Sequence, residues 1–209
     1  MTLKKSFVFG LVFSVFAFAA LAQPNTKPTE TSNITPSNIN NRMTLAEFAK
    51  QAEKDLKTPV LVGNTLSEVS IPVSITTKPL DYGQLLSQLK INEFTAYKSS
   101  GYIQIIPVRD ARSFAIPTVE KGKNYFDDEY VTDSIKLEKA CAGSVLATLR
   151  PIVPQYGHLT TMESANTLII SDFYRNIVRV KAIIKTLEDN IPEKIDCSTI
   201  NNNLAPKKK

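Results

Sequence analysis

The stretch LRPIVPQYGHLTTMESANTLIISD, Leu149–Asp172, decides the fold of the C-terminal half of this chain. Two runs within it, His158–Met162 and Thr167–Ser171, are predicted to be strands with one apolar face. The residues between these runs, Glu163–Asn166, are expected to form the turn. The stretch therefore predicts a pair of neighbouring strands.

A long helix is expected directly after this strand pair. Asp172 is a residue type that caps helices, and apolar side chains then fall on one helix face: Ile177, Val180, Ile183, Ile184 and Leu187. Upstream, Tyr130–Leu137 is predicted to be a strand and Ala140–Leu149 a helix that ends at Arg150-Pro151. The resulting βαββα order predicts a KH-like domain with two helices on one side of a three-stranded sheet.

A second folded unit is predicted nearer the N-terminus. Thr44 followed by Glu47 forms the sequence pattern of a capping box, and apolar residues at helical spacing follow until Thr58-Pro59. A short strand is expected at Val60–Val62. The alternation over Val69–Thr76 predicts another strand, in which Pro72 favours an exposed edge because proline donates no ladder hydrogen bond.

The same unit continues with a helix that starts at Leu80-Asp81 and with two strands, Phe94–Lys98 and Tyr102–Val108. Its order is helix, strand, strand, helix, strand, strand. We therefore expect an α+β protein with two small α/β sandwich domains. The expected bounds are 43–110 for the first domain, 111–125 for a linker, 126–191 for the second domain and 192–209 for a C-terminal tail.

The N-terminal residues are predicted to be a targeting segment. Lys4 and Lys5 precede the apolar run Phe7–Leu21, and Ala20-Leu21-Ala22 is a signal-peptidase pattern. We expect residues 1–22 to be a cleaved signal peptide, with an uncleaved membrane anchor as the alternative, and residues 23–42 to be a flexible polar tether. Cleavage leaves a periplasmic protein with no membrane span.

Export decides how the two cysteines are interpreted. Cys141 and Cys197 would meet in an oxidising compartment, where a disulfide could hold the C-terminal tail on the second domain. Two separate thiols are the alternative. The two cysteines have no metal-ligand spacing, and the single histidine, His158, cannot complete a zinc site. The sequence therefore predicts a possible disulfide and no metal or cofactor.

Charge and motifs do not favour an enzyme or a nucleic-acid-binding protein. The net charge is +5 and includes both signal-peptide lysines, so the mature chain is nearly balanced. KH modules clamp RNA with a GxxG loop, and the glycines of this unit, Gly143 and Gly157, do not form one. No nucleophile or carboxylate is placed to work with His158, which we interpret as structural. Residues 127–129 are interpreted as a solvated acidic approach to a strand.

The quoted stretch, with the run Phe173–Asp189, resembles the repeated periplasmic N-domain of secretins, the outer-membrane gate proteins of bacterial type II secretion. The first unit is similar in element order, and in its IQIIP ending at Ile103–Pro107, to the domain that secretins place ahead of these repeats. The resemblance covers about residues 43–191 and lacks the pore-forming region. It implies domains that stack into periplasmic rings and a first domain that meets the inner-membrane assembly.

Two functional hypotheses follow. The first is a non-enzymatic scaffold of a type II secretion or related type IV pilus machine, which binds secretin rings or the inner-membrane platform and self-associates weakly at most. The second is a stand-alone periplasmic signalling module. Its partner would add a strand at a predicted edge formed by Ile71, Pro72, Val73 and Ser74.

Overall fold

The computed structural model describes residues 41–74 and 78–197. The expected signal peptide, nearly all of the tether and the last twelve residues of the tail lie outside this range. The described residues fall within one compact unit, Pro36–Lys209. None of the helices in the described part of the chain has the length and apolar character needed to cross a bilayer.

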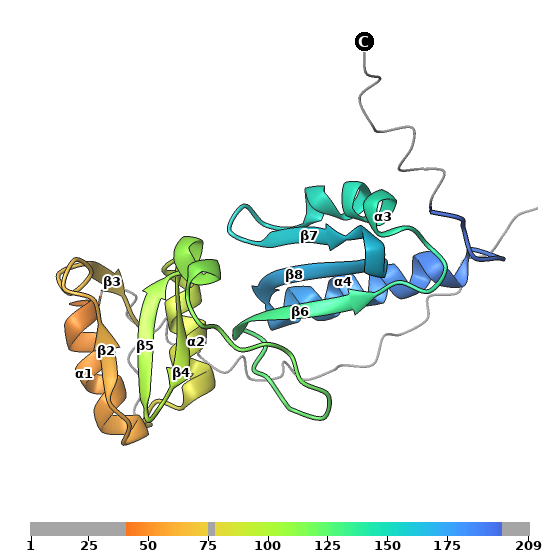
Figure 1. The fold of residues 1–209 in the computed structure, drawn as a ribbon. Helices are drawn as coiled ribbons and strands as arrows, with labels where there is room; N and C mark the ends of the chain where they lie inside the picture. The colour runs from red at the N-terminus through yellow and green to blue at the C-terminus, as the bar shows by residue number, and fades with distance from the viewer. Residues whose placement is uncertain (1–40, 75–77, 198–209) are drawn as a thin grey trace, which may run out of the picture. The chain divides into compact units, whose positions relative to one another are not determined.

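The first half of the described chain forms a two-stranded and a three-stranded sheet with two helices (Figure 1). Strand β2 is parallel to β5, and β4 is antiparallel to β5, in the order β2-β5-β4. The small sheet pairs β1 with β3. The elements are β1 (Arg42–Thr44), α1 (Leu45–Leu56), β2 (Val60–Val62), β3 (Ser70–Pro72), α2 (Tyr82–Ile91), β4 (Phe94–Ser99), β5 (Tyr102–Pro107) and the 3₁₀ turn η1 (Val108–Ser113). We call this half the first module.

The second half has the predicted βαββα order, with β8 at the centre of the antiparallel sheet β6-β8-β7 (Figure 1). Two 3₁₀ turns lie in its loops. The elements are β6 (Tyr130–Lys136), α3 (Ala142–Leu149), η2 (Arg150–Ile152), β7 (His158–Met162), η3 (Glu163–Ala165), β8 (Thr167–Phe173) and α4 (Tyr174–Asp189). We call this half, up to Cys197, the second module. The α+β prediction is confirmed.

Each module has its own apolar core. In the first, apolar residues of α1 and α2 pack on Ile103 and Ile105 of β5. In the second, α3 and α4 pack on one face of the sheet, around Leu168 and Ile170 of β8. Because side chains alternate along a strand, Phe173, three residues after Ile170 in β8, lies on the opposite face. That face therefore remains available for other contacts.

Three local predictions differ from the structure. Sequence patterns missed β1, which is three residues long and pairs with β3. The predicted strand over Val69–Thr76 is a strand only at Ser70–Pro72 among the described residues. The N-cap of α4 is Phe173 and not Asp172, because β8 continues to Phe173 before the helix begins.

Candidate interaction surfaces

The predicted partner-binding residues lie in and after β3. Ile71 pairs with Met43 of β1, and the Val73 N–H donates to the Asn41 carbonyl at 3.0 Å. Ile71 and Val73 are almost fully buried, at 2% and 5% exposure. Their side chains therefore belong to the core of the first module.

The free edge of β3 is already occupied by the side chains of Gln88, in α2, and of Asn92, the residue after α2. The Pro72 carbonyl accepts a hydrogen bond from Asn92 Nδ2 at 3.1 Å, and the Ser74 N–H donates to Gln88 Oε1 at 3.2 Å. Pro72 itself has no N–H to offer. A partner strand would have to displace both side chains and would find no N–H donor at Pro72. Strand addition at this edge stays a prediction, and it requires the loss of these two hydrogen bonds.

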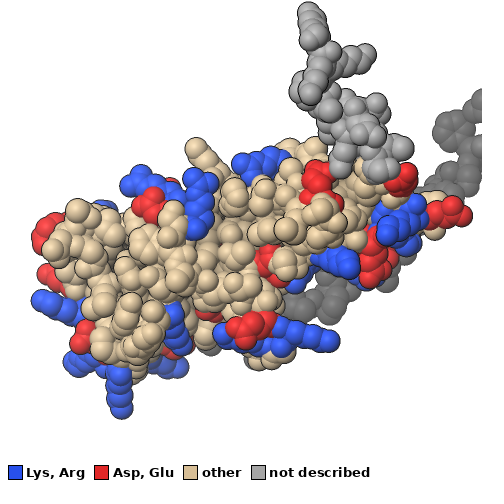
Figure 2. All heavy atoms as spheres, viewed as in Figure 1, with Lys and Arg blue, Asp and Glu red and all other residues tan. Residues whose placement is uncertain are grey.

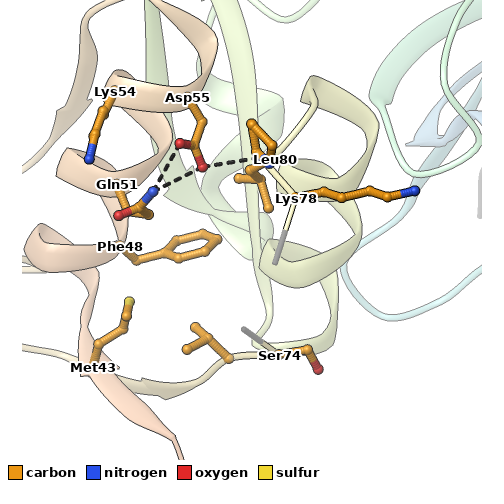
Figure 3. Close-up of a pocket in the computed structure, with 10 residues that line it drawn as sticks. Met43, Phe48, Gln51, Lys54, Asp55, Ser74, Lys78 and Leu80 are labelled. Carbon is orange, nitrogen blue, oxygen red and sulfur yellow. Dashed lines mark hydrogen bonds between the residues drawn. The ribbon is translucent and has the colours of Figure 1, made fainter. Parts of the chain in front are cut away.

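A hollow of about 430 Å³ lies beside this edge, between α1, β1 and the chain before α2 (Figure 3). Its apolar walls come from Phe48 of α1, with Met43, Val73 and Leu80. Polar groups complete the lining: Gln51, Lys54, Asp55, Ser74 and Lys78. An apolar floor with polar groups around it is the usual character of a recognition site.

Asp55 connects two sides of this hollow. Gln51 Nε2 donates to both carboxylate oxygens of Asp55, at 2.9 and 3.0 Å, and the Leu80 N–H donates to Oδ2 at 3.0 Å (Figure 3). These hydrogen bonds, the one from Gln51 first, hold the pKa of Asp55 below its usual value. The carboxylate therefore stays ionised near neutral pH and fixes the segment before α2 against α1.

A second region with many buried contacts is the junction of the two modules. Tyr97 and Ile106 of the first module form one buried cluster with Tyr130 and Phe173 of the second. The Tyr130 hydroxyl donates to the carbonyls of Ser171 or Tyr156, at 3.1 and 2.9 Å. The Tyr130 side chain is 1% exposed, so it packs inside the protein at this junction.

Charged groups reinforce the junction. Lys90 Nζ lies 2.5 Å from Asp128 Oδ1 and 4.6 Å from the centre of the Phe173 ring, and Ser87 Oγ donates to Asp128 Oδ2 at 2.7 Å. Burial alone would raise the pKa of Asp128, but the bonds from Lys90 and Ser87 outweigh it and lower that pKa. The acidic approach 127–129 is thus partly an anchor between the modules.

Asp172 is a buried carboxyl that sequence patterns assigned only to helix capping. It is fully inaccessible, and its oxygens accept hydrogen bonds from the Phe173 N–H and Asn176 Nδ2. Burial raises the pKa of Asp172 in spite of these bonds. Gly157 is needed beside it, because a Cβ at that position would lie 3.0 Å from Asp172 Oδ2 and 2.7 Å from Val153.

The two cysteines meet in the second module. A disulfide joins Cys141, directly before α3, to Cys197, beyond α4. Next to it, the Ile195 N–H donates to the Lys139 carbonyl at 3.0 Å, and Lys139 Nζ donates to the Ile191 carbonyl at 2.9 Å. The chain after α4 is therefore held against the loop before α3 by one covalent and two polar contacts.

No family model matches the chain. It is 33% identical over 107 residues to secretin XcpQ of Pseudomonas aeruginosa, over 51% of this chain and 16% of that protein. Part of the chain is therefore similar to a secretin. Its fold also matches a structure of the Klebsiella pneumoniae type II secretion outer membrane complex, which contains PulD, PulS and the PulC HR domain. That match has a TM-score of 0.62 and 21% identity, over 74% of this chain and 27% of the other.

The secretin resemblance inferred from Leu149–Asp172 is therefore confirmed. The chain spans only a small part of the secretin that it matches. In the second module, His158 lies in β7, opposite Ser171 of β8. Within residues 41–74 and 78–197, no group of three His, Cys, Asp or Glu side chains is placed to hold a metal ion.

Proposed function

We propose that this protein is a non-enzymatic periplasmic scaffold of a type II secretion machine or of a related type IV pilus machine. The similarity to secretin XcpQ is the observation that carries the proposal. Structural components of such machines act by presenting surfaces. The described residues form two apolar cores, a buried junction between the modules and an open hollow. This architecture suits a scaffold.

The two modules are proposed to be the domains expected from sequence, 43–110 and 126–191, joined by the linker 111–125. Separate apolar cores support this division. The linker is partly ordered by the second domain, since the Val119 N–H donates to the Thr132 carbonyl and the Thr132 N–H to the Pro117 carbonyl. Deletion of the linker would therefore remove hydrogen bonds to β6. It would also shorten the connection between the two domains.

The proposed location is the periplasm, reached through a signal peptide at residues 1–22. The disulfide supports this location, because such bonds persist in oxidising compartments and are rare in the cytosol. An associated prediction is that the mature protein starts at Gln23. Mass determination of the protein purified from a periplasmic fraction would test that prediction.

The proposed partner-binding surface is the hollow between α1, β1 and the segment before α2. Its partner is proposed to be a secretin ring or an inner-membrane platform subunit. The Klebsiella complex supports this class of partner, because there PulD is found together with PulS and the PulC HR domain. The apolar wall around Phe48 and Leu80 would supply the contact area, and the polar groups would orient the partner.

Site-specific crosslinking in cells tests this assignment. A photo-reactive amino acid at Gln51, in the hollow, is expected to give crosslinks to a secretin or platform subunit, identified by mass spectrometry. The matched control is the same amino acid at Lys185, an exposed position of α4. Crosslinks to unrelated proteins only, or the same secretion subunits in equal yield from both positions, would refute the proposed surface.

A further inference from the structure

Two hollows meet at Tyr156, on the side of the second module where the chain enters β7. One, of about 480 Å³, includes Lys90, Arg175 and Arg179 in its lining. The other, of about 370 Å³, includes Arg109 and Arg112. Tyr156 lines both, so the two hollows are adjacent and are treated together as one surface. We call it the Tyr156 surface.

Lys90 in this lining is paired with Asp128, but several arginines of the surface have no such partner among the described residues. Arg109, Arg112 and Arg179 form no ion pair with any carboxylate of the residues that the structure describes. Arg179 has only a long hydrogen bond, 3.3 Å, to the Ile152 carbonyl. Arg175 lies 3.7 Å from Asp127, with both side chains largely exposed, so this contact is weak.

The two carboxyl groups in the lining of these hollows are fewer than the four arginines. Asp172 is buried and already bonded to Phe173 and Asn176, and Glu93 is the remaining acidic residue of the lining. Both arginine pairs have helical spacing, Arg109 with Arg112 in η1 and Arg175 with Arg179 in α4. Each pair therefore presents its guanidinium groups in neighbouring positions on one face.

The surface also has an apolar part. Val178 is 47% exposed beside Pro154 and Tyr156 in the larger hollow. Guanidinium groups bind carboxylates through paired hydrogen bonds, and an exposed valine beside an aromatic ring favours an apolar side chain. A ligand that satisfies both parts has carboxylates on either side of an apolar residue.

We propose that the Tyr156 surface binds an acidic peptide segment of a protein partner, with carboxylates at the two arginine pairs and an apolar side chain between them. The surface is separate from the hollow beside β3, so it does not depend on the partner assigned there. A protein segment fits better than a lipid surface, because the cations lie in two hollows around an aromatic residue rather than on a broad basic face. Figure 2 shows acidic and basic side chains interspersed on the face in view.

Fluorescence anisotropy with a labelled peptide, Glu-Glu-Phe-Glu-Glu, tests the proposal on the full mature chain. The pair Arg175→Glu with Arg179→Glu is expected to raise the Kd about tenfold or more, and so is Arg109→Glu with Arg112→Glu. The control is Lys50→Glu with Lys57→Glu, an exposed pair at α1 and its C-cap with the same charge change, which should alter Kd by less than about twofold.

Several results would overturn the proposal: absence of peptide binding, an equal loss in the control variant, equal binding of Gln-Gln-Phe-Gln-Gln, or preferential binding of phosphatidylglycerol vesicles. If the charge reversal lowers the melting temperature of the chain, the double variant Arg175→Gln with Arg179→Gln is measured in its place. This variant removes two charges without adding repulsion, and it should weaken binding by a smaller factor than the reversal.

Discussion

The two modules fix the starts of their helices in different ways. In the first module, α1 and α2 each begin with a complete capping box, formed by Thr44 with Glu47 and by Asp81 with Gln84. In the second module, neither α3 nor α4 has a side-chain cap from its N-cap residue. The helix starts are therefore fixed by residues close in sequence in the first module and by distant residues in the second.

Distant groups replace the missing caps of the second module. The Ala142 N–H at the start of α3 donates to Asn166 Oδ1 at 2.9 Å. At the start of α4, the Tyr174 and Arg175 N–H groups donate to the carbonyls of Glu129 and Asp127. Such contacts form only when the whole module folds. The second module therefore depends more on long-range contacts than the first module does.

The largest expected effect is loss of the disulfide. Replacing Cys141 and Cys197 with serine removes a link across a sequence separation of 56 residues. Loop entropy predicts a loss of about 4 kcal/mol in the free energy of unfolding. Urea unfolding, followed by hydrogen exchange of each module, should locate this loss in the second module. An equal loss of protection in the first module would contradict the comparison.

Asn166 is expected to have the next largest effect. Its Nδ2 donates to the carbonyls of Leu137 and Ala140, its Oδ1 accepts from Ala142, and its φ is +49°. Asn166→Ala should cost about 3 kcal/mol, at about 1 kcal/mol for each lost hydrogen bond.

Asn166→Gly is the control for backbone strain at this position. Glycine adopts positive φ freely, so this variant should recover about 1 kcal/mol relative to alanine. Thermal unfolding of the three proteins measures both effects. Equal stability of the alanine variant and the wild type would mean that the amide does not hold α3.

The capping boxes should have smaller effects. Thr44→Ala or Asp81→Ala should each cost about 1 kcal/mol in the free energy of unfolding, because one N–H of the first helical turn loses its acceptor. Thr44→Ser keeps the hydroxyl and should retain most of the stability. Chemical denaturation of the first module gives the values, and a loss above about 2 kcal/mol would show that this module also depends on more than local capping.

The smallest effects concern two carboxyl groups with opposite pKa shifts. Burial raises the pKa of Asp172, so the wild type loses stability as pH rises through that value. The asparagine of Asp172→Asn does not titrate. The free energy of unfolding of this variant should therefore rise, relative to that of the wild type, from acid to neutral pH. The pKa of Asp128 is lowered, so its contribution is present at neutral pH and is lost as pH falls through the folded value.

Asp128→Asn is the matched control, and it should be less stable than the wild type at neutral pH and approach it in acid. Melting temperatures across the acidic range measure both differences. The same pH trend in the two variants would contradict the assignment of opposite shifts.

Local patterns allowed most elements to be predicted, and long-range contacts explain the failures. The Thr44–Glu47 box and the alternation in β8 depend on neighbouring residues, which a sequence displays directly. Strand β1 is too short to show a period and exists through its pairing with β3. The Asp172 cap was predicted from residue type alone, although burial and the length of β8 decide its position.

The candidate surfaces were harder to predict than the fold. Ile71 and Val73 alternate as an edge strand should, but side chains from α2 and its C-cap cover the edge, those of Gln88 and Asn92. The arginines around Tyr156 come from η1 and α4, more than sixty residues apart in the sequence. Only the folded chain brings them together.

The disulfide also sets how the second module would carry mechanical load. A pull on residues beyond Cys197 is transmitted through the sulfur–sulfur bond to Cys141, directly before α3. The segment between the two cysteines, which contains α3, β7, β8 and α4, lies outside this path and cannot be extended while the bond is intact. Tension would therefore act first on the loop that joins β6 to Cys141, and α4 would not unravel from its C-terminal end.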